Sequence, residues 1–250
     1  MNQKLLCLVL AVFCSTVSLA FMDSLWVVGG EGVPGGLVPV EVWLEYEGAG
    51  GEDMLSAFDV PLTWEAALGT LELISLGPDF VAERWWHQSR IDNQGVLGAP
   101  HISKAGLSSF HMGMGVSRWF VERGSHLAAT LDFRILRTAE PFDSACMDTL
   151  MKAFSPPIFL GFVDKAGINT CVPSFSTGCI EVVPCICGDC NGDRRITVAD
   201  AIYISTYIYK GGDAPICEGD VNLDGRVTAG DAIYLLTYVY RDGLEPCNPP

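Results

Sequence analysis

Two segments near the C-terminus decide the fold of the last quarter of the chain: GDCNGDRRITVADAIYISTYIYKGGDAP at residues 188–215 and GDVNLDGRVTAGDAIYLLTYVYRDGLEP at residues 219–246. They align at an offset of 31 residues, and 15 of the 28 aligned positions are identical. Self-similarity at a fixed period marks a structural repeat. Each copy predicts an acidic loop followed by a short apolar helix, which Gly and Pro residues bring to an end.

The acidic stretch of each copy has the spacing of a twelve-residue calcium loop. In such a loop, oxygen ligands come from positions 1, 3, 5, 9 and 12, and position 7 supplies its backbone carbonyl. The predicted ligands are Asp189, Asn191, Asp193, Arg195, Thr197 and Asp200 in the first loop, and Asp220, Asn222, Asp224, Arg226, Thr228 and Asp231 in the second. A solvated Asp/Asn turn that only caps a helix is the alternative, and two copies in register disfavour it.

These residues resemble the type I dockerins, the calcium-dependent docking modules of secreted polysaccharide-degrading systems. The similarity covers residues 188–243, with both loops, Asp at position 12 and the apolar helix pattern. The resemblance implies two calcium ions, a pair of loop-helix units with pseudo-two-fold symmetry, and a cohesin-type partner. The residues at positions that resemble cohesin-contacting ones are Val198, Ala199, Ala229 and Gly230.

Position 6 of the first loop departs from the family pattern, because Arg194 stands where EF-hand loops have Gly for a sharp turn. A non-Gly residue in a left-handed conformation costs about 1–2 kcal/mol. The second loop keeps Gly225 at this position. We therefore expect calcium to bind more weakly to the first loop, with Gly192 at position 4 allowing some relaxation.

The two helices carry more apolar residues than one inward face needs. The predicted inward stripes are Ala201, Ile204, Tyr207 and Ile208, and Ala232, Leu235, Tyr238 and Val239. The apolar residues left over are Ile202, Tyr203, Tyr209, Ile233, Tyr234 and Tyr240. A module of about 60 residues has little interior to cover them. We expect a separate partner to do so; the alternative is packing against the N-terminal domain of the same chain.

The larger N-terminal part predicts a β-sandwich over residues 21–184. Apolar residues alternate with polar ones from Val38 to Tyr46, from Phe58 to Leu62 and from Leu127 to Ile135, and turn-forming clusters separate such segments. The order of elements resembles a cohesin or a carbohydrate-binding sandwich. The predicted fold is mainly β, followed by a short linker at 185–187 and a small α-helical module at 188–247. Because the linker is so short, we expect the two domains to lie against each other.

The first twenty residues predict an export signal. Lys4 precedes an apolar run from Leu5 to Phe13, and Ser18 and Ala20 supply the small residues of a cleavage site. No later segment is long and apolar enough to span a membrane. The formal charge of −15 argues against nucleic acid as a partner, because phosphates require a basic surface. The predicted location is secreted or extracellular.

Cysteines that follow the signal favour disulfides, because an even number of them enters an oxidising compartment. Cys171 with Cys179 is the preferred local pair, and either Cys187 or Cys190 pairs with Cys247. The alternative for the dense cluster from Cys185 to Cys190 is a zinc site.

No catalytic motif stands out, and the four histidines are scattered. Trp85 and Trp86 suit stacking on sugar rings, although core packing is the favoured interpretation.

We interpret the chain as a secreted, non-catalytic protein that a calcium-loaded module docks to a cohesin-type partner. A small glycoside hydrolase is the alternative, because such modules accompany these enzymes. A third possibility is self-assembly, in which the sandwich of another copy receives the module.

Overall fold

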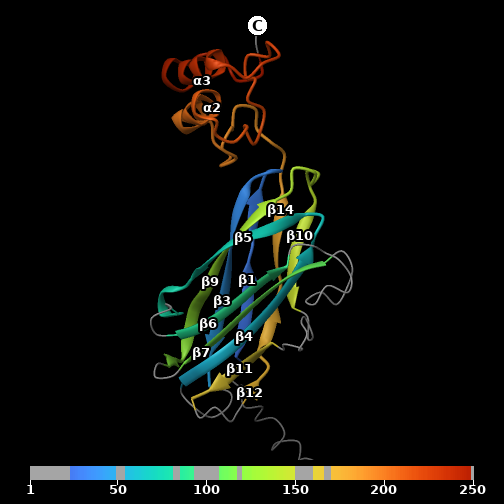
Figure 1. The fold of residues 1–250 in the computed structure, drawn as a ribbon, viewed down its shortest axis with the longest axis vertical. Helices are drawn as coiled ribbons and strands as arrows, with labels where there is room; N and C mark the ends of the chain where they lie inside the picture. Colours follow the sequence, from blue (N-terminus) through green and yellow to red (C-terminus); the bar gives the residue numbers. More distant parts are fainter. Residues whose placement is uncertain are drawn as a thin grey trace, which may run out of the picture.

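The computed structural model describes residues 23–48, 54–80, 85–92, 107–116, 120–149, 160–165 and 170–248; for 85–92, 107–116 and Thr170 it describes only the backbone. A strand-rich body is followed by a pair of helices, which lie together beyond one end of that body (Figure 1). The predicted export signal lies outside these ranges and stays a prediction. No helix within them is long and apolar enough to cross a membrane.

Two β-sheets make up the body, as predicted. The first has the strand order β13-β1-β3-β9-β5. Its strands are β1 (Ser24–Val28), β3 (Leu37–Tyr46), β5 (Gly69–Leu76), β9 (Gly124–Ile135) and β13 (Ser174–Ser176). β13 runs parallel to β1, whereas the other neighbours are antiparallel. A 3-10 turn, η1 (Pro78–Phe80), follows β5.

The second sheet has the order β12-β11-β4-β10-β14-β2, with β7 and β8 also paired to β4, and β6 paired to β7. Its strands are β2 (Gly30–Gly32), β4 (Met54–Glu65), β6 (Trp85–Asp92), β7 (Leu107–Val116), β8 (Val121–Glu122), β10 (Ser144–Thr149), β11 (Gly161–Asp164), β12 (Thr170–Cys171) and β14 (Gly178–Val182). The long strand β4 organises this sheet, because it pairs with four others.

The core between the sheets is built by the alternation that the sequence predicts. Along β3 every second side chain is buried, from Val38 to Tyr46. In β9 the same alternation runs from Ala129 to Ile135. It starts at a bulge opposite Val42 and Trp43, where Ala128 and Ala129 are both buried. An extra residue in one strand of a pair shifts the side chains that follow to the other face, which explains why burial of β9 changes there.

The disulfide pattern corrects one expectation. Cys179 is bonded to Cys146, which lies directly opposite it in the β10–β14 pair with a Cα–Cα distance of 3.9 Å. Cys171 is free and donates to Asp23 Oδ2 at 2.8 Å. The predicted Cys171–Cys179 pair is wrong because β12 and β14 are separated by β11, β4 and β10 in the sheet, and a disulfide needs neighbouring Cα atoms.

Two further disulfides hold the C-terminal module. Cys187 is bonded to Cys247, which confirms one of the two predicted alternatives, and Cys185 is bonded to Cys217. Cys190 is a free, buried thiol. The structure therefore contradicts the zinc alternative, because two cysteines of that cluster are already in disulfides.

The C-terminal module contains α2 (Val198–Lys210) and α3 (Ala229–Arg241), each opened by a capping box formed by Thr and Asp. Its small core consists of Cys190, Ala201, Ile204, Val221, Ala232 and Leu235. The predicted inward stripes are wrong at Tyr207 and Val239, which are both 37% exposed. Tyr203 and Tyr234 pack partly against the core instead. The segment after α3 turns back over that helix, so that Tyr234 Oη donates to the carbonyl of Glu245 at 3.2 Å.

Candidate metal centre

The first acidic loop is organised by the carboxylates at its two ends. Asp189 Oδ1 accepts the N–H groups of Gly192 and Asp193 at 2.8 and 3.0 Å, and its Oδ2 accepts that of Arg194 at 2.8 Å. Asp200 Oδ1 accepts the N–H of Cys190 at 2.9 Å. Asp200 lies in the first turn of α2. Position 12 therefore joins the start of the loop to the start of the helix.

The second loop repeats this arrangement. Asp220 Oδ1 accepts the N–H of Asp224 at 3.0 Å, and its Oδ2 accepts that of Gly225 at 2.7 Å. Asp231, in the first turn of α3, accepts the N–H of Asn222 at 3.3 Å and that of Thr228 at 2.7 Å. The N–H groups at positions 5 and 6 donate to the carboxylate at position 1 in both copies, so the repeat in sequence is a repeat in structure.

The side chains at positions 3 and 5 lie beside one another in both loops. Asn191 Nδ2 donates to Asp193 Oδ2 at 2.9 Å, and Asn222 Nδ2 donates to Asp224 Oδ2 at 3.2 Å. Together with the terminal carboxylates, each loop offers carboxylate and amide oxygens, the ligand chemistry that Ca²⁺ takes in proteins. The chemistry of the donor set therefore fits this ion.

Burial of negative charge is the main electrostatic feature of the loops. Asp189, Asp200 and Asp231 are each 0% exposed, and the ion pairs among the described residues involve other carboxylates. Burial raises the pKa of Asp189; the N–H of Arg194 lowers it, and the charge of Asp200 raises it again. Buried like charges are costly unless a cation is close. A divalent ion would offset this cost.

In the described ranges, no three His, Cys, Asp or Glu side chains lie close enough together to hold a metal ion by themselves. Each loop supplies an Asn amide as well as carboxylates, and backbone N–H groups hold the carboxylates at its two ends.

Backbone geometry bears on the expected difference in calcium affinity between the two loops. Arg194 has φ 68°, the left-handed conformation predicted for position 6, and Gly225 has φ 90°. Position 4 is also left-handed, with φ 77° at Gly192 and 57° at Leu223. Each loop thus holds one Gly and one larger residue in this conformation. The strain that Arg194 places on the first loop is therefore matched by Leu223 in the second.

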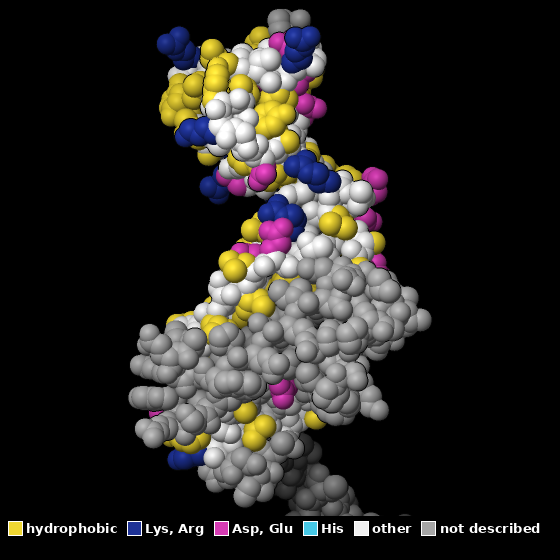
Figure 2. All heavy atoms as spheres, viewed as in Figure 1, with side chains coloured by type: hydrophobic (Ala, Val, Ile, Leu, Met, Phe, Trp, Pro, Cys, Tyr) yellow, Lys and Arg dark blue, Asp and Glu magenta, His cyan; other side chains and the backbone are white. Residues whose placement is uncertain are grey.

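The predicted partner surface is largely exposed. Ile202 is 60%, Tyr209 72%, Ile233 64% and Tyr240 68% exposed, and Figure 2 shows hydrophobic side chains over the helical module. Of the other predicted contacts, Val198, Ala199 and Gly230 are exposed, and Tyr203, Ala229 and Tyr234 are half-buried. Exposed apolar groups in such number are typical of an interaction surface.

An apolar hollow of about 430 Å³ lies at the C-terminal side of this surface. Its lining residues are Gly230, Ile233, Tyr234, Thr237, Gly243 and Leu244. The sequence indicated Gly230, Ile233 and Tyr234 of this hollow, but neither Thr237 nor the segment that follows α3.

An aromatic pair on the sandwich was not predicted. Trp26 on β1 and Trp43 on β3 lie directly opposite each other, and their rings are nearly parallel at 9° with centroids 6.2 Å apart. Both alternate with buried residues, so they lie on the outer face of the sheet; this alternation was the signal that could have identified them. The side chains of Trp85 and Trp86 lie outside the described part of the structure.

Comparison with known proteins supports both parts of this description. Residues 187–240 match the family model of the dockerin type I domain. The third cohesin of ScaC from Acetivibrio cellulolyticus, solved in complex with the ScaB dockerin, is 16% identical with a TM-score of 0.50, covering 65% of this chain and 100% of that chain. A search of curated proteins found no match.

Two further solved structures have lower scores. The sixth cohesin of scaffoldin B from the same organism, in complex with a Cel5 dockerin mutant, is 15% identical with a TM-score of 0.47, covering 64% of this chain and 99% of that chain. A non-cellulosomal cohesin from the archaeon Archaeoglobus fulgidus is 14% identical with a TM-score of 0.44, covering 65% of this chain and 92% of that chain.

The similarity to the ScaC cohesin concerns the sandwich, because 65% of the chain is far more than the helical module contains. At this identity it is evidence for the fold alone. Residues 187–240 thus match the dockerin type I family, and the β-sandwich before them has the fold of a cohesin.

Proposed function

We propose that this chain is a secreted, non-catalytic assembly protein, and that its C-terminal module attaches the sandwich to a cohesin-type partner in a calcium-dependent way. The observation that carries the proposal is the duplicated loop-helix unit, which matches the dockerin type I model and leaves an apolar surface exposed on both helices. Dockerin type I domains bind calcium, and the oxygen donors of both loops fit this ion.

Two calcium ions are proposed, one in each loop. The residues that would hold them are Asp189, Asn191, Asp193, Thr197 and Asp200 with the carbonyl of Arg195, and Asp220, Asn222, Asp224, Thr228 and Asp231 with the carbonyl of Arg226. The bound ion supplies positive charge among buried carboxylates. Asp200 and Asp231 then tie each loop to its helix, since both are the third residue after an N-cap.

Ordering of the helices explains how metal loading and partner binding are connected. Ile202 and Ile233 are the fifth residues of α2 and α3, and both present exposed side chains from the start of the second turn. If the loops lose their order, the small core between the helices is too limited to hold these surfaces in place. Partner binding is therefore expected to require calcium.

The first test measures calcium binding to the full chain by isothermal titration calorimetry. We expect two sites, one lost in Asp200→Asn and the other in Asp231→Asn. Asp242→Asn is the matched control, because it removes the same charge outside the loops and both residues tolerate the left-handed conformation found there. Absence of calcium binding, together with unchanged helical circular dichroism after EDTA treatment, would refute the proposal.

The second test measures binding to a panel of purified cohesins, with the ScaC cohesin named above included. Calcium-dependent binding that is weakened in Ile202→Ala and Ile233→Ala supports the proposal. The sandwich of a second copy is a further candidate receiver, because the chain itself has a cohesin fold. A contact of that kind joins different surfaces and extends into open chains. Calcium-dependent growth in sedimentation velocity, rising with protein concentration, would identify it.

A polysaccharide context is a second proposal, and the Trp26–Trp43 pair favours it. Aromatic rings at a protein surface offer planar apolar faces, and Glu41 lies beside them, accepting the Trp43 Nε1–H at 2.7 Å. Trp26→Thr and Trp43→Thr keep β propensity and are expected to weaken binding to a panel of insoluble polysaccharides. Release of reducing sugars from the same panel would favour the glycoside hydrolase alternative.

A further inference from the structure

The two loops share their ligand spacing but not their surroundings. At position 4 the first loop has Gly192 and the second has Leu223; at position 6 they have Arg194 and Gly225. In the second loop these positions face solvent, since Leu223 is 53% exposed and a Cβ added to Gly225 would have nothing within 4 Å. In the first loop both positions lie against the sandwich.

Position 4 of the first loop is closely packed. A Cβ added to Gly192 would lie 3.0 Å from Ile216 Cγ2 and 3.2 Å from Val33 Cγ2. Val33 follows strand β2 and is 0% exposed, yet it belongs to neither hydrophobic core. Its burial therefore includes the contact between the two domains, and a residue as large as Leu223 would not fit at position 192.

Position 6 of the first loop makes a polar contact with the same end of the sandwich. The Arg194 guanidinium forms an ion pair with Glu31 of β2. Both side chains are about half exposed, at 45% and 53%, so this pair alone contributes little. The second loop has Gly at this position and therefore has no side chain to form such a pair.

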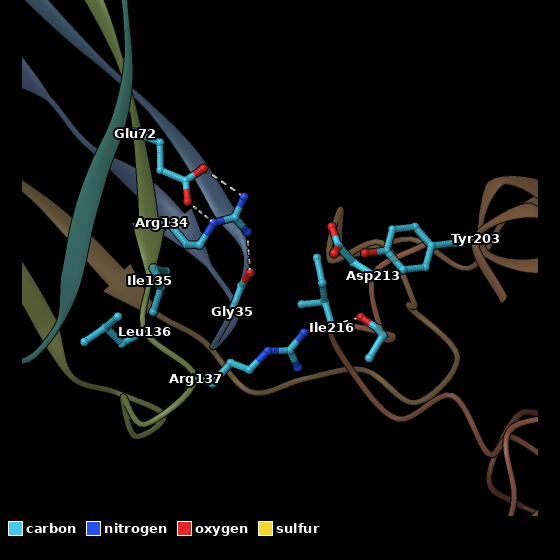
Figure 3. Close-up of a pocket in the computed structure, with 10 residues that line it drawn as sticks. Gly35, Glu72, Arg134, Ile135, Leu136, Arg137, Tyr203, Asp213 and Ile216 are labelled. Atoms are coloured by element: carbon cyan, nitrogen blue, oxygen red, sulfur yellow. Dashed lines mark hydrogen bonds and ion pairs between the residues drawn. The ribbon is translucent and has the colours of Figure 1, made fainter. Parts of the chain in front are cut away.

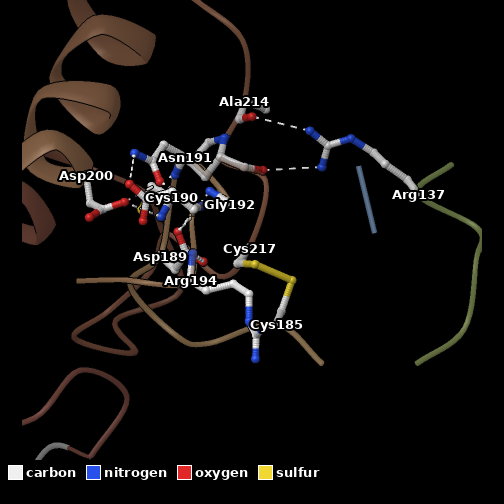
Figure 4. The surroundings of a disulfide bond; sticks show 12 residues. Arg137, Cys185, Asp189, Cys190, Asn191, Gly192, Arg194, Asp200, Ala214 and Cys217 are labelled. Carbon is white, nitrogen blue, oxygen red and sulfur yellow. Dashed lines mark hydrogen bonds between the residues drawn. A yellow bond between two sulfur atoms is a disulfide. The ribbon is translucent and has the colours of Figure 1, made fainter. Parts of the chain in front are cut away.

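A second contact lies beside the loop. Arg137, which follows β9, donates through Nη2 and Nη1 to the carbonyls of Ala214 and Pro215, each at 3.3 Å (Figure 4). The next residue, Ile216, donates its N–H to the carbonyl of Cys190 in the first loop at 3.0 Å. The segment between the repeats thus connects the sandwich to the first loop.

A polar cleft of about 630 Å³ opens next to this contact, with Arg134 and Arg137 on the sandwich side and Tyr203 and Asp213 on the module side (Figure 3). Arg134 is already paired with Glu72. In the described part of the chain, the contacts between the domains run through the first loop and the segment between the repeats.

We infer that the outer surface of the first loop is an interaction surface for the sandwich of the same chain, and that calcium loading of this loop and seating of the module on the sandwich stabilise each other. The inference rests on the proposed function. Its physical basis is that Gly192 and Arg194 both donate their N–H groups to Asp189 while contacting the sandwich. Such coupling is reciprocal. Among the described residues, Leu223 and Gly225 of the second loop make no such contacts, so we expect that loop to be uncoupled.

The test uses the full chain and isolates one site at a time. Asp231→Asn leaves the first site, and Asp200→Asn leaves the second. In each background, calcium titrations compare Glu31→Gln/Arg137→Gln with a control, Glu140→Gln/Lys210→Gln, that removes the same two charges from exposed positions. We expect Glu31→Gln/Arg137→Gln to weaken the first site about fivefold or more, the lower range of measured couplings, and to leave the second site unchanged.

Small-angle X-ray scattering supplies a readout that does not depend on affinity. Removal of calcium is expected to increase the maximum dimension and the flexibility of the Asp231→Asn chain, and Glu31→Gln/Arg137→Gln is expected to do the same in the presence of calcium. Equal calcium affinities in the test and control variants, with unchanged scattering, would overturn the coupling while leaving calcium binding intact. If the Asp231→Asn chain binds no calcium at all, the proposed function itself fails at the first loop.

Discussion

Replacing Gly192 and Gly225 by Ala, one at a time, separates backbone strain from the contact between the domains. Both residues have a left-handed φ, 77° and 90°. Each Ala therefore carries a strain of about 1–2 kcal/mol, partly offset by about 0.4–1 kcal/mol because Ala restricts the unfolded chain. Both variants should therefore lose this same net amount of free energy of unfolding.

Packing around the new methyl group is expected to make the two variants differ in stability. The new Cβ at position 225 meets open space, whereas the one at position 192 lies 3.0 Å from Ile216 and 3.2 Å from Val33. Adding a methyl group to a closely packed site typically costs about 1–3 kcal/mol. We expect Gly192→Ala to destabilise the calcium-loaded module by this amount more than Gly225→Ala.

Thermal unfolding followed by far-ultraviolet circular dichroism at a fixed calcium concentration measures the difference. For a domain of 60–100 residues, 1 kcal/mol corresponds to about 4–8 °C in Tm, so the two variants should be separated by at least that interval. The helices α2 and α3 report on the module, because the sandwich is built from strands. Equal Tm values would refute the reasoning, since they would mean that Val33 and Ile216 do not press on the first loop.

Three further predictions concern the cysteines and the second loop. Peptide mapping under non-reducing conditions should find Cys146 linked to Cys179, and replacing both by Ala should cost about 2–4 kcal/mol; a 171–179 link would contradict the sheet register. Burial raises the pKa of Cys190 and of Cys171 to about 12, so both thiols should resist alkylation at pH 8 in calcium, and Cys190 alone should become reactive after EDTA treatment. Leu223→Gly should stabilise the second loop by about 0.5 kcal/mol, the strain relieved less the backbone entropy of Gly; a lower Tm would show that Leu223 makes a stabilising contact.

The local parts of the site were predictable from the sequence. Asp200 and Asp231 act through hydrogen bonds to residues within the same loop, and such bonds depend on spacing along the chain. The left-handed conformation of Arg194 was predictable for the same reason. Along β3, alternation alone identified the buried face, because side chains of a strand point to opposite sides in turn.

Contacts between distant segments required the tertiary structure. Cys179 pairs with Cys146 rather than with the nearer Cys171 because strand order, not sequence distance, decides which Cα atoms are neighbours. Tyr203 packs partly against the module core and also lines the cleft beside the sandwich, a position that depends on how distant segments meet.

By itself, the sequence determined the repeated loops, their oxygen donors and the helix starts, because these are set by residues a few positions apart. Only the tertiary structure decided that the first loop, and not the second, lies against the sandwich. The contact of Gly192 with Val33 and the pairing of Arg194 with Glu31 join residues more than 150 positions apart. No periodicity along the chain encodes such a distance; it depends on how the two domains meet.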